Sequence, residues 1–163
     1  MASDSSFDVV SQFNRQELVN AIDQTTREIA TRYDLKNTGS EITLDKNSLT
    51  LTSASEFTLK AVRELLLTKA ARRDLSTKIL DFGKVEPAAR GTVRQTVQLR
   101  QGIDQDLARQ ISKLIRDRFP KLRPQIQGDA VRVAGTSKDM LQASMKLLRE
   151  QDYPVPLQFN NYR

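Results

Sequence analysis

The stretch "RPQIQGDAVRVAGTSKDMLQASMKLLR", residues 123–149, holds the most compact pattern of the chain. Its apolar residues alternate with polar ones on both sides of the Gly128–Asp129 pair, as in a β-hairpin that buries one face. After a Gly-Thr-Ser break, the apolar spacing changes to three and four residues, at Leu141, Met145 and Leu148. The stretch therefore predicts strand, turn, strand and helix in immediate succession.

The same pattern occurs earlier in the chain. Residues 48–66, "SLTLTSASEFTLKAVRELL", align with residues 130–148 at a constant offset, so that the apolar positions and the break coincide. Upstream, "NRQELVNAIDQTTREIATRY" aligns with "IDQDLARQISKLIRDRF", and there Leu18 matches Leu107. These matches indicate a duplicated unit of roughly 80 residues, which suits two small domains better than a solenoid.

Each repeat predicts the same order of elements. In the first repeat, a helix over 14–33 precedes a hairpin over 41–52, and Ser53 with Glu56 predicts a capping box that opens a second helix. A strand is expected at 77–82, and the segment "GKVEPAARGT", 83–92, is expected to be a linker. Both halves thus follow the order β-α-β-β-α-β. The sequence predicts an α+β protein of two ferredoxin-like sandwich domains from a tandem repeat.

The composition places the chain in a broad class. Of its 163 residues, 38% are hydrophobic and 28% are charged, which is typical of a globular protein rather than a disordered one. No apolar run approaches the roughly 20 residues that cross a bilayer, and the start does not resemble a signal peptide. The absence of cysteine fits a reducing compartment. We expect a cytoplasmic protein with no membrane partner.

The charge is unevenly distributed along the sequence. Residues 1–90 hold 13 basic and 13 acidic side chains, whereas residues 91–163 hold 13 basic and 7 acidic ones, a net charge of +6. Clustered positive charge attracts phosphates, so the second half is a candidate binding region for an anionic partner. A solvated basic surface that only aids solubility explains the same numbers.

Several kinds of chemistry are missing from the chain. Without histidine or cysteine there is neither a soft-ligand zinc site nor a Ser-His or Cys-His nucleophile pair. No glycine-rich phosphate loop occurs. Asp104 and Asp106 could in principle act as acids, but in a first helical turn they are expected to be caps. The sequence favours a binding module that is not an enzyme and that carries no metal or cofactor.

Three basic or amide-rich features remain as candidate binding positions. The first is a helical stripe of Arg109, Lys113 and Arg116, opposite the apolar residues of the same helix. Such a stripe suits phosphates, and an ordinary solvated helix face has the same pattern. The second is "RQGID", 100–104, where a strand passes through a glycine into a helix. The two aspartates at that helix end would repel an anion, which leaves Arg100 and Gln101 as candidate contacts.

The third feature is the polar face of the predicted hairpin. Gln125, Gln127 and Arg132 share that face, and their amides and guanidinium can hydrogen-bond base edges and phosphates. A sheet that reads RNA normally also offers aromatic rings for stacking. The nearest candidates are Phe7 and Phe159, on neighbouring strands. An exposed sheet face of ordinary polar residues is the alternative interpretation.

Four motifs together resemble one known family. The motifs are "SFDVVS" at 6–11, "LRQGID" at 99–104, "QIQGDAVRVAG" at 125–135 and "PLQFNNYR" at 156–163. In this order they resemble the bacterial YajQ family over essentially the full length. The chain departs from the family pattern in "QFN" at 12–14 and in "GTSKDM" at 135–140, where a more basic stretch is common. This loss of positive charge argues against a phosphate contact at 135–139.

The resemblance implies two ferredoxin-like domains whose N-terminal strands are exchanged. The first domain would cover residues 12–100, with its strand at about 92–100 supplied by the second repeat. The second, basic domain would combine residues 1–11 with 101–163. The positions that match the family pattern, taken with the helical stripe, give the following candidate nucleotide-binding residues: Arg100, Gln101, Gly102, Lys113, Arg116, Gln125, Gln127, Gly128, Asp129 and Arg132.

The resemblance also implies a function. The family is described as nucleotide-binding, with members linked to cyclic di-GMP and to RNA, and it has no agreed enzymatic activity. We therefore expect a non-catalytic protein that binds cyclic di-GMP, GTP or ATP and acts through a partner such as a transcription factor. The alternative is a scaffold that binds transfer or ribosomal RNA, or another protein, without a small-molecule pocket.

Overall fold

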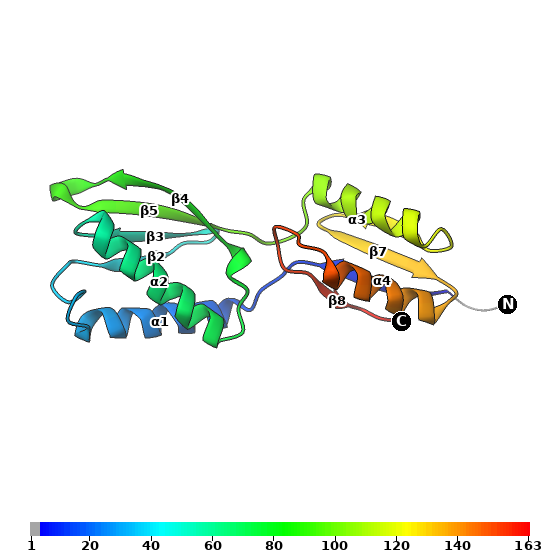
Figure 1. Ribbon diagram of the computed structural model, residues 1–163, viewed down its shortest axis with the longest axis horizontal. Coiled ribbons are helices and arrows are strands. Elements are labelled where there is room, and N and C mark those ends of the chain that lie inside the picture. The colour runs from blue at the N-terminus through cyan, green and yellow to red at the C-terminus, as the bar shows by residue number, and fades with distance from the viewer. Residues whose placement is uncertain (1–3) are drawn as a thin grey trace. The chain divides into compact units, whose positions relative to one another are not determined.

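The computed structural model describes residues 4–163, which form four α-helices and eight β-strands (Figure 1). In chain order these are β1 (Ser5–Val10), α1 (Arg15–Thr31), β2 (Glu41–Leu44), β3 (Ser48–Ser53), α2 (Glu56–Arg72), β4 (Leu80–Pro87), β5 (Val93–Leu99), α3 (Gln105–Arg118), β6 (Arg123–Gln127), β7 (Ala130–Gly135), α4 (Lys138–Glu150) and β8 (Gln158–Asn160). Two short 3₁₀ turns, η1 (Thr77–Ile79) and η2 (Ala89–Gly91), precede and follow β4.

The strands form two antiparallel sheets of four strands each. Their orders are β6-β7-β1-β8 and β2-β3-β5-β4. The structure thus confirms the predicted α+β class with two ferredoxin-type sandwiches. β1 pairs with strands of the second repeat, and β5 pairs with strands of the first. The exchange of strands as the origin of this arrangement stays a prediction.

The chain divides into two compact units. The continuous unit is Phe13–Arg100, and the split unit combines the chain up to Gln12 with Gln101–Arg163. The division follows from the sheets, because β1 lies between β7 and β8 while β5 lies between β3 and β4. Every strand of one sheet therefore belongs to one unit.

In the continuous unit, α1 and α2 cover one face of the sheet (Figure 1). The helical spacing seen in the sequence buries Leu18 and Ile22 of α1 and Leu59 and Leu66 of α2. Alternation along the strands turns Leu49, Leu51 and Val97 to the same side. The opposite face of the sheet keeps hydroxyl, amide and charged side chains.

In the split unit, α3 and α4 cover one face of the other sheet. Val9 of β1 and Val131 of β7 pair directly and are completely buried beneath these helices. Phe7 packs edge to face on Phe159 of β8, with ring centroids 5.7 Å apart. The core of this unit therefore joins β1 to strands far along the chain.

A side chain caps the N-terminus of each α-helix within residues 4–163. Asn14 accepts from the Glu17 N–H at 3.3 Å, and Asp104 accepts from the Leu107 N–H at 2.8 Å. α4 has the Ser137 hydroxyl as its cap. In α2, however, Ser55 forms the capping box, and the expectation of Ser53 was wrong because β3 extends through that residue.

The predicted linker at 83–92 is wrong for a similar reason. Residues 80–87 form β4, which pairs with β5 through a bulge between Phe82 and Val85. Gly83 lies in this bulge, and an added Cβ there would come within 2.9 Å of the Thr96 carbonyl oxygen. The glycine therefore permits a close approach of two strands rather than a flexible connection.

Residues 4–163 contain neither a membrane-spanning helix nor a cluster of acidic metal ligands. Within that range no helix has both the length and the apolar character that crossing a membrane requires. The same residues contain no group of three or more acidic side chains placed to hold a metal ion.

Candidate functional site

The uncovered face of the split unit's sheet carries one row of polar side chains across all four strands. The strand register sets Gln125 of β6 opposite Arg132 of β7, Arg132 opposite Asp8 of β1, and Asp8 opposite Asn160 of β8. Gln127, two residues along β6, donates from Nε2 to Oε1 of Gln125 over 3.4 Å. The three hairpin residues predicted from the sequence therefore lie together on one face.

Asp8 is the electrostatic centre of this row. Arg132 donates to its carboxylate from Nε over 2.9 Å and from Nη2 over 3.4 Å, and the Asn161 amide donates over 2.8 Å. Although only 8% of Asp8 is exposed, the hydrogen bond from Arg132 lowers the pKa of its carboxyl, against the opposing effect of burial. The same bond raises the pKa of Arg132. Both groups are therefore ionised at neutral pH.

A second group of predicted residues meets at the end of the same hairpin. The Ile103 N–H donates to the Asp129 carbonyl oxygen over 2.9 Å, and the Gly102 N–H donates to the Ser11 carbonyl oxygen over 2.7 Å. Gly102 has a φ of +86°, and a Cβ on it would lie 2.9 Å from Oδ2 of Asp129. Two motifs that are separate in the sequence thus pack against each other, and both require this glycine.

Gln101 and Gly128 flank this contact. Both residues are exposed, as is Asp129. Gly128 and Asp129 follow Gln127 directly in the chain, and Gln101 directly precedes Gly102. The structure therefore brings seven of the predicted residues into one neighbourhood of the split unit: Gln101, Gly102, Gln125, Gln127, Gly128, Asp129 and Arg132.

The other three predicted residues lie elsewhere. Arg100 belongs to the continuous unit, where its Nη2 lies 3.2 Å from Oδ1 of Asp81. Lys113 and Arg116 are exposed on α3, in the helix layer, whereas Gln125 and Arg132 lie on the opposite, uncovered side of the sheet. The helical stripe and the hairpin face are therefore two different surfaces of the split unit.

The rings of Phe7 and Phe159, the candidates for base stacking, are not available on the uncovered face. Phe7 is completely buried, and Phe159 packs on it beneath the helices. The guanidinium of Arg149 lies over the Phe159 ring, 5.0 Å from its centroid. Among the described residues of the row from Gln125 to Asn160 there is no aromatic side chain.

The net charges of the two folded units differ from the net charges of the two halves of the sequence. The split unit contains 11 basic and 9 acidic side chains, a net charge of +2, whereas the continuous unit contains 15 and 11, a net charge of +4. The reason is that Arg94 and Arg100 join the continuous unit, while Asp4 and Asp8 join the split unit. The more basic unit is therefore the one that contains most of the neutral half.

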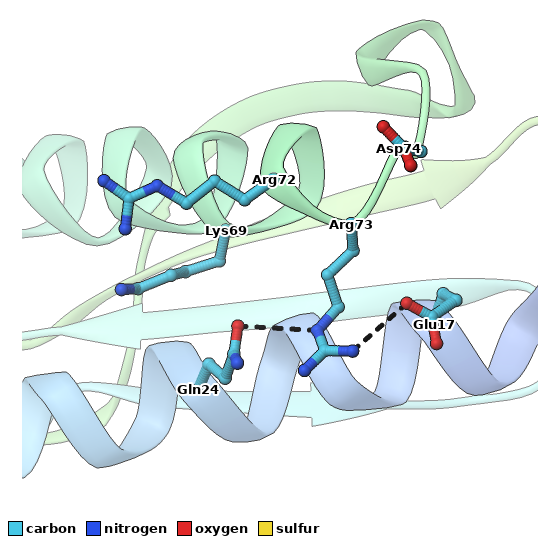
Figure 2. Close-up of a pocket in the computed structure, with 6 residues that line it drawn as sticks. All are labelled: Glu17, Gln24, Lys69, Arg72, Arg73 and Asp74. Carbon is cyan, nitrogen blue, oxygen red and sulfur yellow. Dashed lines mark hydrogen bonds and ion pairs between the residues drawn. The ribbon is translucent and has the colours of Figure 1, made fainter.

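A hollow between α1 and α2 of the continuous unit was not predicted from the sequence. It has a volume of about 460 Å³ and is lined by Glu17, Gln24, Lys69, Arg72, Arg73 and Asp74 (Figure 2). Gln24 and Lys69 also line an adjoining hollow of about 410 Å³, with Arg27, Glu28 and Thr31. A signal for it exists in the sequence, since the α1 residues recur at helical spacing and three basic residues cluster at the end of α2.

Known proteins are similar to this chain over its whole length. A nucleotide-binding protein of Synechococcus sp. (strain JA-2-3B'a(2-13)) is 60% identical over 163 residues, covering 100% of both chains. Nucleotide-binding proteins of Chloroflexus aurantiacus (strain ATCC 29366 / DSM 635 / J-10-fl) and Trichodesmium erythraeum (strain IMS101) are 58% and 57% identical, again over 100% of each chain. The family model described as "Nucleotide-binding protein YajQ-like" matches residues 5–163. The chain therefore belongs to the YajQ-like family.

Proposed function

We propose that this protein binds a nucleotide, without catalysing its turnover, on the uncovered face of the split unit beside the β6–β7 turn. The relatives named above are called nucleotide-binding proteins, and their names state no reaction. The observation that carries the location is the convergence of seven predicted residues on one hairpin and the loop that packs against its turn.

The chemistry of this face suits a base edge. The amides of Gln125, Gln127 and Asn160 each offer donors and an acceptor, which match the mixed pattern of a purine edge. The contacts of Arg132 with Asp8 engage Nε and Nη2. They leave the N–H groups of Nη1 for a phosphate or base oxygen. Asp8 holds the guanidinium in this position before a ligand arrives.

The ligand class we propose is a purine nucleotide, with cyclic di-GMP, GTP and ATP as the candidates. The protein would act in the cytoplasm as a sensor, and the bound state would be read by a protein partner such as a transcription factor. Neither a metal nor a cofactor takes part in this proposal.

A second candidate function is RNA binding on the helix layer of the split unit. Lys113 and Arg116 are exposed on α3, and neither makes an ion pair within residues 4–163, whereas Arg109 pairs with Asp106 over 3.2 Å. Unpaired cations in a row can neutralise successive phosphates of transfer or ribosomal RNA. The same exposed surface would also serve a scaffold that binds a protein.

Calorimetric titration with cyclic di-GMP, GTP, ATP and transfer RNA, each at low and high salt, separates these functions. Saturable binding of one nucleotide, little changed by salt and about tenfold weaker in Arg132→Ala, is the result expected. Lys60→Ala, an exposed substitution in α2, is the matched control and should bind normally. Equal losses in both variants would refute the location. Binding of RNA alone, lost at high salt, would favour the second function.

A further inference from the structure

The hollow between α1 and α2 gathers three cations at one end of a helix. Lys69 and Arg72 lie in the last turn of α2, and Arg73 follows as its C-cap. Figure 2 shows Arg73 reaching from α2 toward Gln24 and Glu17 of α1, while Lys69 and Arg72 extend from α2 in a common direction. The C-terminal end of a helix interacts favourably with positive charge, so this position suits basic side chains.

Two of the three cations are held in place by partners on α1. Arg73 donates from Nη1 to Oε2 of Glu17 over 3.2 Å and from Nε to the Gln24 amide oxygen over 3.5 Å. Lys69, whose side chain is only 14% exposed, lies 3.1 Å from Oε1 of Glu28. These contacts place both cations in the lining of the hollow.

Arg72 differs from its two neighbours. Within the described residues it lines the hollow without an ion pair or a side-chain hydrogen bond. Glu17 and Glu28 are one-third or more exposed. Solvent reaches both carboxylates, so an anion with more oxygen atoms can compete with them for Arg73 and Lys69. The hollow thus offers one free guanidinium and two exchangeable cations.

The charge and size of the hollow define the class of ligand. The two adjoining hollows are lined by four basic and three acidic side chains, a net charge of +1. A phosphate group carries close to two negative charges and three acceptor oxygens, which suit a lining that holds several cations. Volumes of about 460 and 410 Å³ lie in the range of small-molecule sites and leave room beyond a phosphate.

We propose that this hollow binds a phosphorylated small molecule, with the phosphate beside Lys69 and Arg72. Gln24 lines both hollows and is placed to hydrogen-bond the part of the ligand next to the phosphate. The proposal concerns the continuous unit alone and does not depend on the surface proposed above for the split unit.

Calorimetric titration of the full chain with pyrophosphate, at an ionic strength fixed with sodium chloride, tests the proposal. Pyrophosphate carries no base, so it reports on phosphate recognition alone. Saturable binding that weakens about tenfold or more in Arg72→Ala is the expected result. Because the exposed Arg72 forms no ion pair or side-chain hydrogen bond within residues 4–163, this variant should unfold like the natural chain. Lys60→Ala, on the same helix but outside the hollow, should leave binding unchanged.

The absence of saturable pyrophosphate binding would overturn the proposal, as would equal affinities of Arg72→Ala and the natural chain. If pyrophosphate binds as expected, competition with GTP identifies the class of molecule that carries the phosphate. Displacement of pyrophosphate by GTP would make the ligand a nucleotide, and a failure of GTP to displace it would make the ligand another phosphorylated molecule. Nucleotide binding that is lost in Arg72→Ala but kept in Arg132→Ala would support this hollow and refute only the split-unit surface.

Discussion

Arg132 of β7 and Asp8 of β1 form the central ion pair of the split unit's uncovered sheet face, with Nε and Oδ1 2.9 Å apart. The pair links two strands from opposite ends of the chain. Asn161, which follows β8, donates to the same carboxylate. One acidic residue therefore joins three segments that the sequence keeps far apart.

Asp8→Asn should lower the free energy of unfolding by about 1–2 kcal/mol near neutral pH, because it removes charge-assisted hydrogen bonds from a mostly buried position. The folded protein lowers the pKa of Asp8, so this stabilisation is complete above the pKa of the unfolded chain. It is lost as the pH falls through the folded pKa. Urea unfolding measured from pH 7 to pH 2 should show the free energies of unfolding of Asp8→Asn and of the natural chain becoming equal in acid.

The control for Asp8→Asn is Glu86→Gln, which breaks an exposed pair with Arg94. It should change the free energy of unfolding little at any pH. A constant gap between Asp8→Asn and the natural chain down to pH 2 would show that the carboxylate charge is not what stabilises this face.

Gly102→Ala should destabilise the protein by about 2–4 kcal/mol, because it combines a left-handed backbone with a contact against Asp129. Gly39→Ala is the matched control, since Gly39 also has a positive φ but nothing lies within 4 Å of its added Cβ. It should cost only about 1 kcal/mol. Thermal or urea unfolding measures both. Equal losses would mean that the packing of the two motifs contributes nothing.

Gln95→Leu should lower the free energy of unfolding by about 1–3 kcal/mol, since it leaves two groups without their buried partner. Gln95 is 4% exposed, accepts from Arg63 over 3.0 Å and donates to the Gly83 carbonyl oxygen over 2.6 Å at the bulge of β4. Gln98→Leu, exposed on the same strand, is the control and should be nearly neutral. A neutral Gln95→Leu would show that the bulge holds its shape without this bond.

Gln125→Ala and Gln127→Ala should reduce discrimination between GTP and ATP by about three- to tenfold, because amides read the base and not the phosphates. Arg132→Ala should instead weaken both nucleotides to a similar extent. Thr96→Ala, on the exposed sheet face of the continuous unit, controls for general effects of substitution. Titration calorimetry of the four variants gives the ratios. Unchanged discrimination in both glutamine variants would remove the hairpin from base recognition.

Much of the fold could be predicted from the sequence, because the information for it is local. Periodicity identified the helices, the hairpins and their buried faces, and the repeat identified two similar units. The order of strands in each sheet could not be predicted in this way, because no local pattern indicates that Val9 pairs with Val131 or that Val97 pairs with Leu49. The prediction of a linker at 83–92 was wrong for this reason. Only the pairing with β5 shows that Gly83 lies in a bulge of a strand.

The candidate site was less accessible to prediction. Alternation placed Gln125, Gln127 and Arg132 on one face, and the structure agrees. The helical stripe of Lys113 and Arg116 was also correct as an exposed face, but the sequence could not tell that it lies on the other side of the sheet. The net charge of each half of the sequence did not predict the net charge of each folded unit. The reason is that β1 and β5 each join the unit formed mainly by the other half of the sequence.

The pairing of β1 has a consequence for synthesis on the ribosome. The continuous unit can fold as soon as Phe13–Arg100 has emerged, whereas Val9 waits for Val131, about 120 residues later. At bacterial translation rates this delay lasts on the order of 6–25 s. Throughout it, β1 is an apolar strand without a partner, and a neighbouring nascent chain on the same messenger carries the same strand. Completed copies can therefore exchange β1, so intertwined dimers are the assembly error that this chain order favours.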